Sequence, residues 1–271
     1  MNDNFLKYFI LIAVYSVLIA YIYFKNRNKL VFFEKKKSLF IDFFFVILKA
    51  SKILFVIVLV FTFGIVLILS NFINTLLGGF DIADLLGINN KLSIGILFII
   101  IFTFADYLLH SILHTKLFWP IHRLHHSASI LTPFTSSRNH PFGAIFVPFL
   151  RVFPIALFGS NMEVVTIVLL ANLIYQPMVH SDLESNWGWF GKYILLSPVH
   201  HKLHHSINPN DYGKNLSILA IWDHLFGTYK EPPINKKITT GVNLEHYEDY
   251  NFIRIIYVDF IEFVSLIKKK F

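Results

Sequence analysis

Long apolar runs separated by short polar segments dominate the first part of the chain. Three runs approach the length of a membrane span: residues 5–24, with Lys7 as their only charge, residues 53–73, with no charge, and residues 92–109, with Asp106 near the end. A helix needs about 20 apolar residues to cross a hydrocarbon core about 30 Å thick. We therefore expect three membrane-spanning helices. The first run lacks the small-residue cleavage site of a signal peptide, so we interpret it as a retained span.

Positive charges predict the orientation of these spans. Six basic residues lie within 25–37, whereas the loop 74–91 carries two aspartates and one lysine. Basic residues favour the cytoplasmic side, so we place residues 25–37 there, and the third span then brings residues 110–126 to the same side. Residues 38–52 are apolar apart from Asp42 and two lysines. This composition favours a helix in the membrane interface over a further crossing.

Two further apolar arms, residues 142–158 and 164–179, are shorter than a comfortable span, and Pro148 and Pro154 interrupt the first arm. A short turn at Gly159 separates them. We expect a re-entrant hairpin that returns the chain to the side on which it entered.

Composition and charge fit a membrane protein. The chain is 55% hydrophobic with a mean hydropathy of +0.58, which is too apolar for an ordinary soluble domain of 271 residues. We predict an all-α, multipass membrane helical protein with a cytoplasmic, histidine-rich helical cap. The expected regions are 1–91 for the N-terminal spans, 92–230 for the histidine-rich part and 231–271 for a cytoplasmic tail. The net charge of +7 suits anionic lipid headgroups, so it requires no nucleic-acid partner.

All 13 histidines lie at or after His110, and two similar phrases, His122–Ser127 and His201–Ser206, hold six of them. Each phrase has histidines at positions i, i+3 and i+4, which share one face of a helix. We therefore expect each triplet to direct three imidazoles at one spot. Ser197 followed by proline predicts the start of the second helix. We interpret the basic residue inside each phrase, Arg123 and Lys202, as a charge facing solvent or lipid headgroups.

Besides the two triplets, a pair of histidines, His110 and His114, is spaced i, i+4 at the end of the third apolar run. Asp106 lies one turn earlier and is a candidate to orient an imidazole. With the two triplets, these residues make eight histidines, enough for two metal ions. Imidazole suits zinc, copper, iron and nickel, so the ligand type leaves the metal open. The sequences Glu-x-x-His and His-Glu-x-x-His are absent, which excludes the carboxylate-rich di-iron bundle and the common zinc-protease motif.

The order and spacing of these histidines resemble the three histidine boxes of the fatty acid hydroxylase and sterol desaturase superfamily of integral-membrane di-iron oxygenases. The flanking segments match too: residues 138–141 resemble its R-x-H-P segment, residues 180–182 its lone histidine, and residues 222–228 its W-D-x-L-F-G-T phrase. The resemblance runs from about residue 92 to residue 229. Ser111 and Gly143 depart from the residues usual in the family, which weakens the assignment to one substrate branch.

The resemblance implies that the boxes hold two iron ions, which activate the co-substrate O2 and hydroxylate or desaturate a C–H bond of a membrane lipid such as a sterol, fatty acyl chain or alkyl lipid. The implied metal ligands are His110, His114, His122, His125, His126, His180, His201, His204 and His205. Candidates for residues that orient or pack beside the ligands are Asp106, His140, Asp182, Asn215, Asp223 and His224.

Such a reaction needs electrons from outside. The chain has no cysteine for an iron–sulfur cluster and no G-x-G-x-x-G dinucleotide motif. We therefore expect an external donor such as cytochrome b5 or ferredoxin with its reductase. The bacterial inner membrane and the endoplasmic reticulum are both compatible with the sequence.

A different class of function is a non-catalytic membrane metal-binding or metal-transport protein. Transport predicts ionisable residues inside several spans, whereas the runs 5–24 and 53–73 have none near their centres. We therefore favour an enzyme of the oxidoreductase class.

Overall fold

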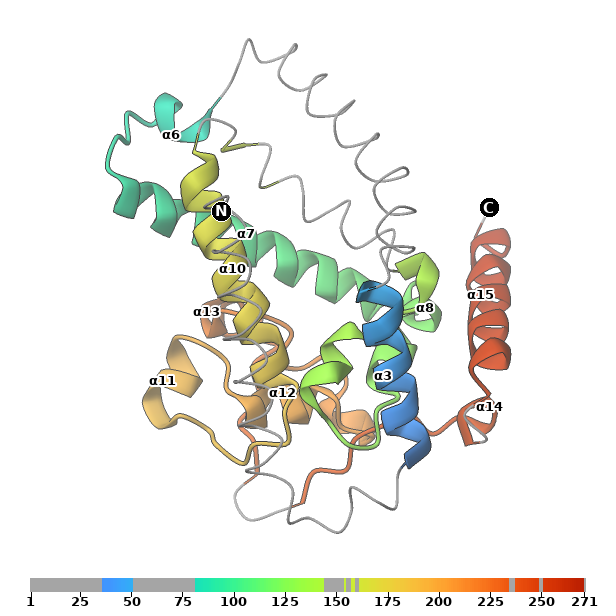
Figure 1. The fold of residues 1–271 in the computed structure, drawn as a ribbon. Coiled ribbons are helices and arrows are strands. Elements are labelled where there is room, and N and C mark those ends of the chain that lie inside the picture. Colours follow the sequence, from blue (N-terminus) through green and yellow to red (C-terminus); the bar gives the residue numbers. More distant parts are fainter. Residues whose placement is uncertain are drawn as a thin grey trace, which may run out of the picture.

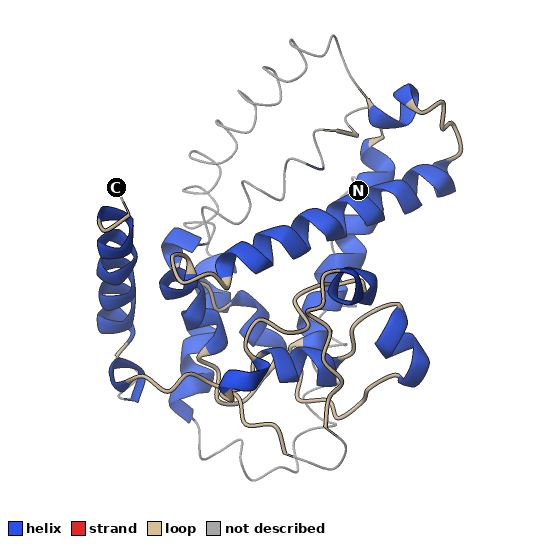
Figure 2. Ribbon diagram, turned by 180° about the vertical axis from the view of Figure 1, so that it is seen from behind, coloured by secondary structure: helices blue, strands red, loops and turns tan. Residues whose placement is uncertain are grey.

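The computed structural model describes residues 36–50, 81–143, 154, 157–158, 161–233, 237–248 and 251–270. Within these residues every regular element is a helix (Figures 1 and 2), as the all-α prediction requires. The elements in chain order are α3 (Lys36–Ala50), α6 (Ile82–Leu85), α7 (Lys91–Leu113), α8 (Trp119–His126), the 3-10 helix η2 (Pro133–Ser137), α10 (Met162–Val179), α11 (Gly188–Tyr193), α12 (Pro198–His204), the 3-10 helix η3 (Pro209–Asp211), α13 (Ala220–Leu225), α14 (Glu245–Glu248) and α15 (Phe252–Lys268).

The apolar run that we predict as the third span is helix α7. Asn90 caps its start, because the Asn90 side chain accepts hydrogen bonds from the backbone N–H groups of Leu92 and Ser93. Among the described residues α7 is the one helix long and apolar enough to cross a membrane. The runs 5–24 and 53–73 and most of the arm 142–158 lie outside the described residues, so the multipass arrangement remains a prediction.

Helix α10 packs against α7 through an apolar cluster. Phe98 of α7 is fully buried and meets Phe158 edge-on, with 5.1 Å between the ring centroids, and Val165 of α10 joins the same cluster. Near the end of α10, the Tyr175 hydroxyl donates a hydrogen bond to the Leu196 carbonyl, just before α12. This bond and the cluster fix the end of α10 beside α7 and α12, which carry the histidine boxes (Figure 1).

A second apolar cluster joins elements from both ends of the described chain. Ile41 and Phe45 of α3 pack with Leu124 of α8, Tyr247 of α14 and Ile255 of α15. The sequence predicts a helix in this N-terminal segment, and α3 is that helix, whereas its place in the membrane interface stays a prediction. The cluster places α3 and α15 against α8, the helix that carries the first histidine triplet (Figure 1).

The interpretation of Arg123 and Lys202 as solvated charges is wrong. Arg123 is buried, and its guanidinium donates hydrogen bonds to Asp259 and to Glu262 of α15, at 2.7 Å for both Nε to Asp259 and Nη2 to Glu262. Lys202 pairs with Asp182, and both side chains are largely buried. The sequence positions of these cations give no sign of the carboxylates that pack against them from other elements.

Candidate metal centre

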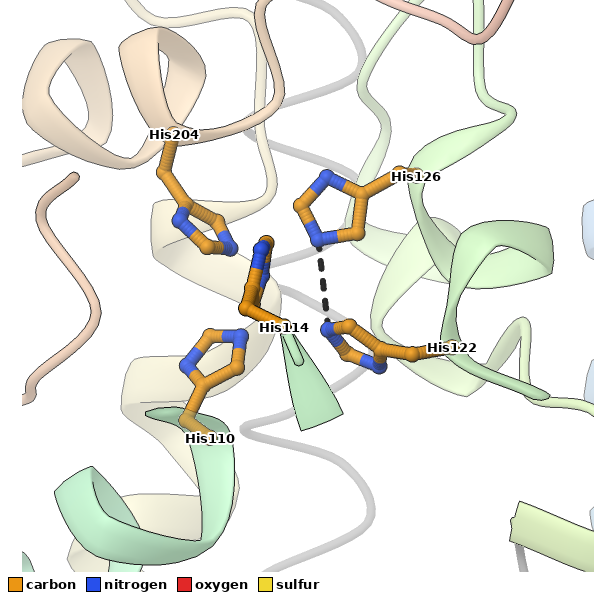
Figure 3. A group of neighbouring side chains, drawn as sticks. All are labelled: His110, His114, His122, His126 and His204. Carbon is orange, nitrogen blue, oxygen red and sulfur yellow. Dashed lines mark hydrogen bonds between the residues drawn. The ribbon is translucent and has the colours of Figure 1, made fainter. Parts of the chain in front are cut away.

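Five histidines gather at the end of α7 and form what we call the five-histidine group. One ligand nitrogen from each lies within 4.8 Å of the others, and Figure 3 shows their rings turned toward a common centre. They come from α7 and its C-cap, from α8 and from α12. The members are His110, His114, His122, His126 and His204.

Four more histidines form a second group, which we call the four-histidine group. They come from α8, from the C-cap of α10, and from α12 and its C-cap, and all four are buried. Their ligand nitrogens also lie within 4.8 Å of one another. The members are His125, His180, His201 and His205. The two groups adjoin, because the ring centroids of His126 and His205 are 4.3 Å apart.

The expectation that each triplet meets at one spot is wrong, because each triplet is divided between the groups. On α8, His122 and His126 enter the five-histidine group, while His125 enters the four-histidine group. On α12 the division is reversed: His201 and His205 share a group, and His204 crosses to the other. With about 100° per residue, positions i and i+4 are about 40° apart, whereas i+3 and i+4 diverge by about 100°. Each helix therefore presents histidines to two neighbouring centres.

Backbone carbonyls fix the ring orientation of four of these histidines. A carbonyl oxygen only accepts hydrogen bonds, so the Nδ1 atom bonded to it must carry the proton, and Nε2 keeps its lone pair. This is the usual arrangement of a metal-binding histidine. The pairs are His110 with Leu216 at 2.7 Å, His125 with Arg138 at 3.2 Å, His180 with Gln176 at 2.7 Å and His204 with Lys214 at 2.8 Å.

The nitrogen atoms that face one another fit a bound cation. The Nε2 atoms of His125 and His180 are 3.1 Å apart, and both rings carry their proton on Nδ1, so two lone pairs meet. A metal ion between them would turn this repulsion into coordination. His204 Nε2 and both ring nitrogens of His114 are buried and have no hydrogen-bond partner among the described residues. Buried polar atoms are normally satisfied, so these orphans also point to metal ligation.

Burial keeps these imidazoles in the neutral form that binds metal. It is the main cause that lowers the pKa of seven of them well below the ordinary value, and neighbouring imidazoles add to the effect because two positive charges would repel. Burial also lowers the pKa of His180 to about 4. Neutral ligands at physiological pH favour metal binding. The seven are His114, His122, His125, His126, His201, His204 and His205.

Asp223 and Asn215, which are candidates from the sequence to orient the ligands, act on the backbone near the site. The Asp223 carboxylate accepts hydrogen bonds from the backbone N–H groups of Leu216 and Ser217, both at 2.9 Å, and from two hydroxyls. The Asn215 side chain bonds the backbone N–H and carbonyl of Lys230. Both residues thus hold the loop whose carbonyls, at positions 214 and 216, bind His204 and His110.

Three other candidate orienting residues, His140, His224 and Asp182, bond groups outside the two histidine groups. His140 bonds the Ile256 carbonyl through Nε2 and accepts the Phe142 N–H at Nδ1. His224 bonds a carbonyl of α11 and stacks on a tyrosine ring 4.0 Å away. Asp182 pairs with Lys202, and Asp106 is buried in α7 one turn before His110.

Several residues beside the site were not found from the sequence. The rings of Trp119 and Tyr212 lie 5.3 and 5.2 Å from the ring of His114. The four acceptor carbonyls leave no sequence signal, because every residue has a carbonyl. Asp42 is fully buried and pairs with Arg138. A lone carboxylate in an apolar helix was the available signal, and it was interpreted as an interfacial charge.

Comparison with known proteins gives matches over the histidine-bearing region. The fatty acid hydroxylase family model matches residues 95–228. Human alkylglycerol monooxygenase is 32% identical over 141 residues, which cover 51% of this chain and 31% of that protein. The ornithine lipid hydroxylase OlsE of Rhizobium tropici is 28% identical over 152 residues, covering 54% and 45%. The Delta(7)-sterol 5(6)-desaturase of Eremothecium gossypii is 30% identical over 155 residues, covering 52% and 39%.

The matched segment therefore spans less than half the length of each of these three relatives. No solved structure matches the chain.

Proposed function

Residues 95–228 belong to the fatty acid hydroxylase family, and from this premise we propose that the chain is a membrane oxidoreductase that uses two iron ions and O2 to oxidise a C–H bond of a lipid. The names of the relatives describe enzymes that act on an alkylglycerol, an ornithine lipid and a sterol. Oxidation of a lipid is common to all three. The names alone do not select one lipid for this chain.

The observation that carries the proposal is the division of nine histidines into two adjoining groups of five and four. Each group offers enough imidazole nitrogens for one ion. Two irons, when bound, would supply the reductive activation of O2. Among the described residues neither group includes a carboxylate or thiolate, so the ligand set that they offer is neutral and its donors are of one chemical kind.

The protein's own contribution to this chemistry is to fix the ligands and exclude water. The carbonyl-bound Nδ1 atoms hold the rings of His110, His125, His180 and His204 so that each Nε2 faces its group. Rigid ligands reduce the reorganisation needed during the reaction. The four-histidine group is buried throughout, which shields reactive species from bulk water and from side reactions.

Helix α7 carries a stripe of exposed apolar side chains that suits contact with lipid. Its exposed apolar residues recur at multiples of four positions, and each step of four turns about 40° around the axis, so they form a stripe that winds about half way around the helix. We propose that this stripe faces lipid and that the substrate approaches laterally from the bilayer. Its members are Leu92, Ile96, Ile100, Leu108 and Ile112.

We further propose that the site faces the cytoplasm and receives electrons from a separate protein. The orientation follows from the basic residues at 25–37. Lys268, Lys269 and Lys270 at the end of α15 are exposed and would attract an acidic carrier such as cytochrome b5 or ferredoxin. This attraction weakens as salt screens the charges.

Lipid extracts from a host that expresses the chain under air test the proposed function. Mass spectrometry should reveal a lipid that has gained oxygen or lost two hydrogens, relative to a host without the chain. The matched control is His125→Ala, which removes one ligand of the four-histidine group and should abolish the new lipid while the protein still accumulates in the membrane. The same new lipid at the same level in the His125→Ala host would contradict the proposal.

A further inference from the structure

We propose that Asp42 and Arg138 form a positioning unit that holds His125 in the four-histidine group. The inference rests on the proposed function, since it assigns a role toward the metal that this group would bind. It extends the site beyond the matched region 95–228, because Asp42 belongs to α3. Neither side chain touches the reacting atoms, so both are positioning residues.

The Asp42 carboxylate is the centre of a buried network. Its Oδ1 accepts a hydrogen bond from Arg138 Nε at 2.6 Å, and its Oδ2 accepts the hydroxyls of Thr132 and Thr135, both at 3.0 Å. Asp42, Thr135 and Arg138 are all fully buried. Thr132 and Arg138 are the N-cap and C-cap of the 3-10 helix η2. A single carboxylate from α3 therefore ties down both ends of this turn.

The 3-10 helix η2 sets the position of a metal ligand through the backbone of its C-cap, Arg138. The Arg138 carbonyl accepts the Nδ1–H of His125 at 3.2 Å. This bond fixes the tautomer of His125 and directs its Nε2 toward His180, whose Nε2 is 3.1 Å away. The Arg138 guanidinium also donates from Nη1 to the Ser127 hydroxyl at 3.0 Å, just past the end of α8. Arg138 thus connects the turn to the helix that carries His125.

Loss of Asp42 should act strongly on this link. A buried guanidinium whose carboxylate partner is removed is strongly unfavourable, so Arg138 must shift toward other acceptors or solvent. Such a shift moves the Arg138 carbonyl and frees the His125 ring. The other three carbonyls that hold ligands belong to Gln176, Lys214 and Leu216. The damage should therefore fall on the four-histidine group first.

A second buried pair provides a matched control on α8, the helix that carries His125. Arg123 of α8 pairs with Asp259 of α15, and their side chains are 4% and 0% exposed, close to the values of 0% and 1% for Arg138 and Asp42. The Arg123 pair joins α8 to α15, whereas the Arg138 pair holds a turn that supplies a carbonyl to a ligand. Asp259→Asn should therefore lower stability without selecting one metal ion.

The experiment measures the metal content of the purified full-length protein in detergent, loaded with Fe(II) under anaerobic conditions. Mass spectrometry counts ions per chain, and the rate of release to a chelator is followed below the unfolding temperature of each variant. Wild type should hold two ions. Asp42→Asn should hold one ion tightly and release the other about tenfold faster or more, as loss of outer-shell support commonly does. Thr135→Val, a milder change, should accelerate release of the same ion by a smaller factor.

Three outcomes would overturn the proposal. If Asp42→Asn and Thr135→Val both keep two ions with wild-type release rates, the network does not position a ligand. Asp259→Asn that loses one ion in the same way would show that any weakening of α8 has this effect. Wild type with fewer than two ions would overturn the inference and the proposed function together. By contrast, wild type with two ions and no lipid oxidation would overturn only the proposed function.

Discussion

Replacing Asp223 with asparagine should release the ion of the five-histidine group while sparing the other. Asp223 is fully buried and holds the loop whose carbonyls at positions 214 and 216 orient His204 and His110. Asparagine has nearly the same shape, but one carboxylate oxygen becomes an NH2 group. That NH2 group cannot accept hydrogen bonds, so it is left facing the N–H and O–H donors that the carboxylate oxygen had bound.

The magnitude follows from the hydrogen bonds of the carboxylate. Oδ2 accepts from the Ser217 backbone N–H and hydroxyl, and Oδ1 accepts from the Leu216 N–H and the Thr228 hydroxyl. Asparagine keeps one acceptor and loses the two bonds of the other. A hydrogen bond to a charged group contributes about 1.5–3 kcal/mol, so the free energy of unfolding should fall by about 3 kcal/mol or more. Metal affinity at the five-histidine group should fall by about 10–100-fold.

Thermal unfolding and metal counts on the purified variant measure both effects. Glu163→Gln is the control, because Glu163 pairs with Lys91 in an ion pair whose side chains are 68% and 73% exposed. Exposed pairs contribute about 0–1 kcal/mol, so this control should keep both ions and nearly its full stability.

The double variant Asp223→Asn/Asp42→Asn identifies which ion each change releases. If the two carboxylates support different groups, each single variant keeps one ion and the double variant keeps none. A double variant that still holds one ion tightly would mean that both changes act on the same group. Asp223→Asn with wild-type stability and two ions would refute the reasoning from the loop.

Three further predictions concern pH, electrons and topology. The pKa of His180 is about 4 in the fold against an ordinary value of 6.5, so the unfolded chain binds more protons between these two pH values. The stability of the metal-free protein should therefore be fully present above pH 6.5 and fall toward pH 4. Denaturant unfolding measures this stability across the range, and a constant value would contradict the reasoning. Purified protein with O2 and lipid alone should not turn over repeatedly, whereas adding a cytochrome b5 or ferredoxin system should start turnover. Cysteines introduced at Ser38 and Ser206 should react with an impermeant label from the cytoplasmic side and one at Asn74 from the opposite side; labelling of the first two from different sides would exclude the predicted hairpin.

Local patterns predicted the helices of the site well, because their signals lie within a few residues. Ser197 caps α12 and Pro198 begins it, as expected, and the apolar run from residue 92 is helix α7. The spacing of the histidines also indicated that they share a region. Helical periodicity and capping depend on residues that are close in the chain, so both can be predicted from a single sequence.

Contacts between distant elements could not be obtained in the same way. The pairing of Arg123 with Asp259 and of Arg138 with Asp42 joins residues that are 136 and 96 positions apart. The division of each triplet between two groups depends on how α7, α8, α10 and α12 are placed in space. Backbone carbonyls orient four of the ligands, and no residue type identifies them.

The content and electronic state of the metal test the central claim most directly. Protein purified from iron-57-supplemented cells should contain two irons per chain, and its Mössbauer spectrum should be that of two high-spin, magnetically coupled ions, without the optical absorption of haem. Asp42→Asn should lower the share of coupled iron pairs in this spectrum and raise the share of single, uncoupled iron. A wild-type protein that contains zinc or haem, or at most one iron per chain, would contradict the account.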